Sequence, residues 1–125
     1  MAGKYTLRVP TEFAAAHRLH GYPGDCSRLH GHNWKVEIEV TGEKLDDVGM
    51  VVDFKVIKRV AKQVADQLDH GYLNEIPPFD EINPTAEHLA RYFYREIGER
   101  LNDDSAQVTA VTLWETDRAC VRYSE

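Results

Sequence analysis

The chain has 125 residues and a mass of 14.3 kDa, enough for one domain with its own hydrophobic core, which we expect to span residues 1–125. With 42% hydrophobic and 29% charged residues, the composition excludes an intrinsically disordered chain. The formal charge of −6 argues against general nucleic-acid binding, and no apolar run is long enough for a transmembrane helix or a signal peptide. We therefore expect a cytoplasmic protein with neither a nucleic-acid nor a membrane partner.

The N-terminal part of the chain predicts two strands. Apolar side chains alternate from Lys4 to about His17, and Pro10 within this segment indicates an edge strand or a bulge. A loop rich in Gly, Pro and Asp follows. The segment from Trp34 to Thr41 then alternates strictly between apolar and polar residues, which predicts a strand with one buried and one solvated face.

Two amphipathic helices are predicted in the middle of the chain. Asp53 is a suitable N-cap for a helix from about residue 54 to residue 68. The second helix is expected to have Pro84 in its first turn and either Asn83 or Thr85 as its cap. The segment between the two helices is expected to be a loop.

Two short strands, at about residues 107–115 and 119–123, close the chain. The resulting order β-β-α-α-β-β predicts an α+β fold with two helices on one face of an antiparallel sheet. The first of these strands has apolar residues on both faces, and its second apolar face predicts a contact with another subunit. Alternation assigns Val111, Leu113 and Glu115 to one face, and Val108, Ala110 and Trp114 to the other.

Histidines carry the strongest chemical signal, because four of the six fall within sixteen consecutive residues. Residues two apart on a strand point to the same side, so His30 and His32 can converge on one metal ion. Catalytic zinc commonly has three protein ligands and an open position, and His17 would supply the third if the first two strands pair. A chance His-x-His pair is the alternative, but His17 and a nearby cysteine favour a metal site. His20 and His88 are expected to take no part.

Cys26 lies four residues before His30 and has three interpretations. It could be the fourth ligand of a closed structural zinc site, a free thiol beside a catalytic metal, or a buried cysteine. The polar loop around it argues against simple core packing. A thiol beside a cation and a histidine becomes a usable base or nucleophile.

Two carboxylates are further candidates for chemistry. Asp69 precedes His70 and can hold its imidazole in one tautomer, although a histidine at the C-terminal end of a helix is also favoured by the helix dipole alone. Glu115 lies at the apolar end of a strand, where a carboxylate needs a partner. That partner would be either an arginine or two adjacent N–H groups of a ligand.

Taken together, these motifs resemble the 6-pyruvoyltetrahydropterin synthase family over nearly the whole chain. The segments that carry the resemblance are residues 13–19, 26–33, 53–54, 68–70, 83–87 and 114–116. The short spacing between Cys26 and the His30-Gly31-His32 motif is most similar to the bacterial members that form 6-carboxy-5,6,7,8-tetrahydropterin in queuosine biosynthesis.

The resemblance implies a tunnelling fold, in which the sheets of several subunits join into a barrel in a homo-oligomer, a hexamer built as a dimer of trimers. It also implies a zinc-dependent lyase that converts 7,8-dihydroneopterin triphosphate to 6-carboxy-5,6,7,8-tetrahydropterin and releases acetaldehyde and triphosphate. One alternative is the pyruvoyl-forming enzyme, which eliminates triphosphate from the same substrate. Another is a non-catalytic zinc-binding or pterin-binding protein.

The same resemblance implies roles for individual residues. The metal Zn²⁺ would be held by His17, His30 and His32; Cys26 would be the catalytic base, with Asp69 and His70 completing a proton relay; and Glu115 and the backbone near Thr85 would bind the pterin. His70 is expected to come from a neighbouring subunit. Apart from the resemblance, Arg18 and Arg28 flank the expected metal ligands, and we expect one of them to steer the triphosphate, with an ordinary surface ion pair as the alternative.

Overall fold

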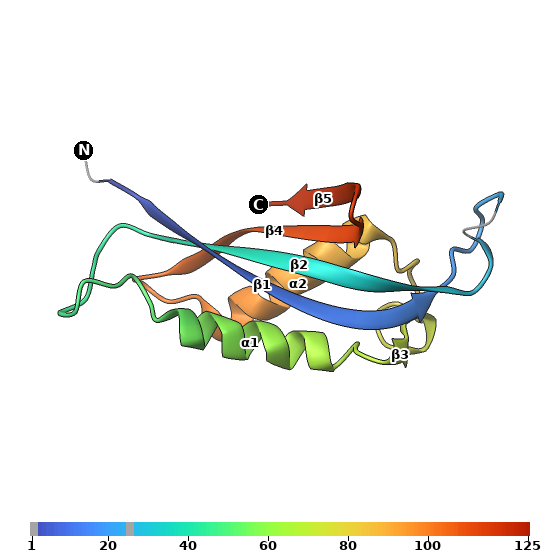
Figure 1. Cartoon of the computed structure of the whole chain (residues 1–125), viewed down its shortest axis with the longest axis horizontal. Helices are drawn as coiled ribbons and strands as arrows, with labels where there is room; N and C mark the ends of the chain where they lie inside the picture. The colour runs from blue at the N-terminus through green and yellow to red at the C-terminus, as the bar shows by residue number, and fades with distance from the viewer. Residues whose placement is uncertain (1–2, 25–26) are drawn as a thin grey trace.

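Figure 1 shows the computed structural model of the chain, which describes residues 3–24 and 27–125. In chain order the elements are β1 (Tyr5–His17), β2 (His30–Gly42), α1 (Phe54–Asp66), β3 (Gly71–Tyr72), the short 3-10 helix η2 (Leu73–Glu75), α2 (Ala86–Leu101), β4 (Gln107–Thr116) and β5 (Ala119–Tyr123). The predicted α+β class and the order of the main elements are confirmed. The two-residue strand β3 is an addition, in a segment expected to be a loop.

The sheet has five strands in the order β3-β1-β2-β4-β5. Strands β1 and β2 form a long antiparallel hairpin whose register is unbroken from Tyr5 opposite Gly42 to His17 opposite His30. Strand β3 pairs with β1 only beside residues 15 and 16, so β1 is an edge strand at Pro10 within the described chain. The edge-strand prediction for Pro10 is confirmed, and the alternative of a bulge is wrong.

Both helices pack against the apolar face of this sheet, α1 along β1 and α2 along β4 and β5 (Figure 1). Phe13 stacks on Trp34 and on Phe93 of α2, with ring centroids 5.9 Å and 5.5 Å apart. Burying each such side chain contributes about 1.5–3 kcal/mol to stability. The four residues predicted for the buried face of β2 are fully buried: Trp34, Val36, Ile38 and Val40.

Each helix begins at a side-chain cap. Asp53 accepts a hydrogen bond from the Lys55 N–H at 2.8 Å and starts α1 as predicted. Thr85 accepts one from the His88 N–H at 3.1 Å and is the N-cap of α2. Pro84 therefore precedes the cap instead of lying in the first helical turn, because the extended backbone of Thr85 delays the start of the helix.

A bulge in β4 corrects the faces predicted by alternation. Val40 pairs with Val108 and Glu39 pairs with Ala110, so one residue of β4 is extra at this point. The bulge moves Val108 to the core side of the sheet, where it is 3% exposed. The subunit contact predicted for the opposite face stays a prediction.

That opposite, outer face of the sheet contains a paired charge. Glu39, expected on the solvated face of β2, is only 4% exposed, so full solvation of this face is wrong. Its carboxylate accepts hydrogen bonds from Nε and Nη2 of Arg122 at 2.9 Å and 3.3 Å. Arg122 also holds the pKa of Glu39 below its ordinary value.

In the part of the chain that is described, neither helix is long and apolar enough to cross a membrane.

Candidate metal centre

Three histidines lie where the apolar face of the sheet ends. In the β1–β2 register His17 is opposite His30, and His32 is opposite Ala15, so all three imidazoles point to the side occupied by Trp34. The rings of His17 and His32 meet the Trp34 ring edge to face, with centroids 5.0 Å and 5.1 Å away. The hairpin register thus brings together the three residues that the sequence singled out as metal ligands.

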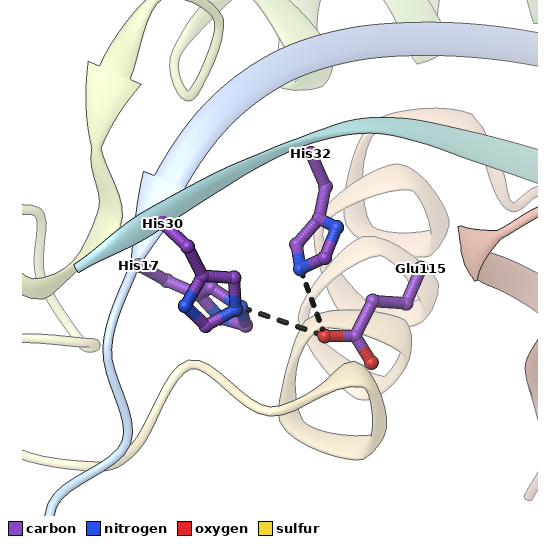
Figure 2. Close-up of side chains that lie close together, drawn as sticks. All are labelled: His17, His30, His32 and Glu115. Carbon is purple, nitrogen blue, oxygen red and sulfur yellow. Dashed lines mark hydrogen bonds and ion pairs between the residues drawn. The ribbon is translucent and has the colours of Figure 1, made fainter. Parts of the chain in front are cut away.

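Glu115 of β4 completes this cluster. Its Oε1 lies 3.1 Å from Nε2 of His32 and 3.5 Å from Nε2 of His17. Figure 2 shows the carboxylate facing the histidine rings. Nε2 of His17 lies 2.9 Å from Nε2 of His30. All four ligand atoms are within 4.8 Å of one another. Sequence reasoning assigned Glu115 to a pterin and missed this contact, although its shared face with Leu113 was a signal that it belongs on the core side.

Backbone carbonyls orient two of the imidazoles. The Pro84 carbonyl accepts a hydrogen bond from Nδ1 of His17 at 2.8 Å, and the Arg28 carbonyl accepts one from Nδ1 of His30 at 2.7 Å. Because a carbonyl can only accept, the proton of each ring sits on Nδ1. The Nε2 lone pairs then face the centre of the cluster, as metal ligation requires.

The electrostatics of the cluster suit a cation. Burial lowers the pKa of His17 and of His32, so both rings are neutral near pH 7, which is the form that binds metals. Nε2 of His32 is buried and makes no hydrogen bond of good geometry with any described group. A buried polar atom in this state is costly, and a divalent cation would satisfy it. Three imidazole nitrogens and one carboxylate oxygen form a donor set that Zn²⁺ accepts.

Asp69 and His70 form the expected carboxylate–imidazole pair at the edge of β1. Asp69 Oδ1 accepts from the Ala14 N–H at 2.8 Å, and Oδ2 lies 2.9 Å from Nδ1 of His70. The Ala14 N–H is the main cause of a lowered pKa for Asp69. The His70 side chain is 84% exposed, and an open hollow lined by residues 14–16, 31–33, 70 and 71 lies beside it.

The other predicted site residues among those described are not members of the four-residue cluster. The Thr85 hydroxyl caps α2, and the Arg28 contact with the cluster is made by its carbonyl. The side chains of Arg18 and Arg28 form no ion pair with any described residue, so the surface ion pair is not observed there. Cys26 lies outside the described residues, and its role stays a prediction.

Comparison with known proteins places the chain in a family. The profile of the family described as 6-pyruvoyl tetrahydropterin synthase matches residues 6–125. The 6-carboxy-5,6,7,8-tetrahydropterin synthases of Rickettsia typhi and Haemophilus influenzae are 34% and 27% identical, and the matches cover 94% and 95% of this chain and 97% and 99% of theirs.

A solved structure has the same fold. The 6-pyruvoyl tetrahydropterin synthase of Caenorhabditis elegans superposes with a TM-score of 0.88 and 28% identity, over 99% of this chain and 97% of that one. The resemblance detected from the motifs is therefore confirmed. This chain belongs to the 6-pyruvoyl tetrahydropterin synthase family and is an enzyme of the tetrahydropterin synthase type.

Proposed function

We propose that this chain is a zinc-dependent lyase that converts 7,8-dihydroneopterin triphosphate to 6-carboxy-5,6,7,8-tetrahydropterin, releasing acetaldehyde and triphosphate. The observation that carries the proposal is the convergence of His17, His30, His32 and Glu115 in a chain of this family. The names of the relatives in Rickettsia typhi and Haemophilus influenzae favour the carboxy product over the pyruvoyl product. The proposal includes a cytoplasmic homohexamer working in queuosine biosynthesis.

The metal site would consist of Nε2 of His17, His30 and His32. Zn²⁺ bound there supplies a Lewis acid that polarises the substrate's side-chain hydroxyls and eases enolisation. The carbonyls of Pro84 and Arg28 keep two of the rings aimed at the centre. Burial keeps His17 and His32 neutral, so little proton competition opposes ligation at pH 7.

Proton transfer is assigned to Cys26, Asp69 and His70. The Cys26 thiolate takes the carbon-bound proton, and His70 exchanges protons with it or with the substrate. Asp69 stays ionised through the Ala14 N–H and accepts from Nδ1 of His70, which leaves Nε2 of that ring free to gain or lose a proton. The high exposure of His70 in one chain suits a contribution to the site of a neighbouring subunit.

Glu115 is assigned to the pterin, whose 2-amino and ring N–H groups match a carboxylate in bidentate fashion. Its contact with His32 also makes it a candidate fourth metal ligand, and Glu115→Gln separates the two roles. If Glu115 binds the pterin, this variant should keep stoichiometric zinc and have a higher KM. Loss of zinc with the carboxylate would instead assign Glu115 to the metal.

The decisive experiment measures product and zinc content on the same sample. Mass spectrometry should find 6-carboxy-5,6,7,8-tetrahydropterin and acetaldehyde, whereas a pyruvoyl product without acetaldehyde assigns the chain to the alternative enzyme. Cys26→Ala should keep zinc and lose turnover. Loss of zinc in that variant indicates a closed structural site and a non-catalytic protein. Cys120→Ala, which removes an exposed thiol, is the matched control and should keep both.

Triphosphate binding is assigned to Arg18 or Arg28, because a guanidinium pairs well with phosphate oxygens and neither side chain has an ion-pair partner among the residues described. Replacing each arginine with Ala should raise KM for the triphosphate substrate in one variant. An unchanged KM in both variants would remove this assignment.

A further inference from the structure

Residues 69–84 form hydrogen bonds along the edge of β1 that is not paired with β2. At Ala14, the N–H donates to Asp69 Oδ1 at 2.8 Å and the carbonyl accepts from the His70 N–H at 2.6 Å. Strand β3 pairs beside residues 15 and 16. The strand itself ends at His17, but bonding along this edge continues beyond it.

Two asparagine side chains make the bonds that follow the strand end. Asn74 of η2 accepts from the Arg18 N–H at 2.9 Å and donates from Nδ2 to the Arg18 carbonyl at 2.9 Å. Asn83, just before α2, makes the same pair of bonds with His20, both at 2.9 Å. A carboxamide carries one acceptor and a donor group like a peptide unit, so each asparagine substitutes for a strand residue.

These four hydrogen bonds hold the residues immediately after His17, the candidate metal ligand at the end of β1. Without them, the chain beyond His17 would lack these hydrogen bonds to a neighbouring segment. Pairing with β2 ends at His17 itself, opposite His30, and strand ends open more easily than strand centres. Asn83 also precedes Pro84, whose carbonyl orients the His17 ring at 2.8 Å. Three hydrogen bonds therefore join residues 17–20 to residues 83–84.

We propose that Asn74 and Asn83 are positioning residues of the metal centre. They hold the chain after His17 in register with the segment that contains Pro84, and so keep Nε2 of His17 aimed at the position of the metal. They act through His17 and touch neither metal nor substrate. This inference rests on the proposed metal site.

The test compares Asn74→Ala and Asn83→Ala with Asn102→Ala. Asn102 is a matched control because its side chain also bonds to backbone, accepting from the Val108 N–H at 2.7 Å, but at the opposite end of α2. Metal-free protein is titrated with Co²⁺ and followed by its visible absorption, which reports ligand geometry. We expect each of the two site variants to bind Co²⁺ about tenfold more weakly, with a changed spectrum, and the control to match wild type.

Hydrogen exchange on the metal-free wild-type chain tests the bonds without any substitution. The Arg18 and His20 amides should exchange far more slowly than free-peptide amides although both residues are exposed. If an alanine variant does not fold, Asn83→Asp replaces it, because it keeps the acceptor and sets an oxygen against the His20 carbonyl.

The outcomes separate this inference from the proposed function. Wild-type affinity and spectrum in both site variants overturn the positioning role alone. Free-peptide exchange at Arg18 and His20 also overturns it alone. A wild-type chain that binds neither Zn²⁺ nor Co²⁺ overturns the proposed function and this inference together.

Discussion

Two clusters that each contain a carboxylate lie on opposite faces of the same sheet, and they differ in how the charge of that carboxylate is balanced. On the outer face, the Glu39 carboxylate accepts from Arg122 at 2.9 Å and 3.3 Å, with Arg8 at 3.9 Å. On the core face, the Glu115 carboxylate meets only imidazoles among the described residues, at 3.1 Å from His32 and 3.5 Å from His17.

The difference distinguishes a structural cluster from a candidate binding site. Glu39 is satisfied by permanent cations of the chain, so nothing further is needed there. The core cluster presents His17 and His32, whose pKa values are lowered by burial, the partly exposed carboxylate of Glu115, and a buried nitrogen of His32 without a hydrogen-bond partner among the described residues. The core cluster could therefore hold a metal ion, whereas the outer cluster is an ion pair complete within the chain.

The largest expected effect is the loss of one imidazole. His32→Ala should weaken Zn²⁺ binding by more than about 100-fold, beyond the range of losses typical for residues that only orient a ligand. Turnover should fall with it. Titration with a chelating competitor measures the affinity, and His20→Ala, a variant outside the cluster, should bind as wild type. Equal affinities in the two variants would show that the core cluster is not the metal site.

Removal of the metal should destabilise the protein through the core cluster alone. At free zinc about 100-fold above Kd, binding adds about 2.7 kcal/mol, which corresponds to a Tm rise of roughly 8 °C for a chain of this size. Scanning calorimetry with and without chelator measures it. The same shift should occur in Arg122→Met, because the outer cluster does not depend on metal. If chelator leaves the Tm unchanged, the core cluster does not bind metal and does not differ from the outer cluster in this respect.

Breaking the ion pair between Glu39 and Arg122 should have a smaller effect, and it should change stability without changing zinc binding. Arg122→Met leaves the buried Glu39 carboxylate without its bidentate partner and should lower Tm by several degrees, while zinc affinity stays within twofold of wild type. Arg95→Met, which breaks the exposed pair between Arg95 and Glu125, is the control and should change Tm little. Zinc loss in Arg122→Met would mean that the two clusters are coupled.

The smallest expected effect is a pH dependence that comes from Glu39. Arg122 holds the pKa of Glu39 below its ordinary value near 4.5, so the folded state binds this proton less readily than the unfolded chain. The resulting stability is present above about pH 4.5 and is lost as the pH falls through the folded pKa. The unfolding free energies of wild type and Glu39→Gln, measured with denaturant, should therefore converge over the acidic range below about pH 4.5. A constant difference over that range would contradict the assignment.

Local patterns in the sequence determined much of this protein. The two-residue period of β2 predicted both its buried face and the shared direction of His30 and His32, because alternation is a property of the extended backbone. Asp53 marked the start of α1 because its side chain caps nearby N–H groups. The family motifs identified the family through residues 13–19, 26–33 and 83–87, without any coordinates.

Tertiary structure decided the features that depend on register between distant strands. The bulge in β4 moved Val108 into the core, and pairing across strands buried Glu39 under Arg122. The same long-range register brought Glu115 to the histidines, and it set Asn83 against His20, 63 residues apart. Each of these contacts joins segments far apart in the chain, and the alternation within a single strand carries no information about which partner lies beside it.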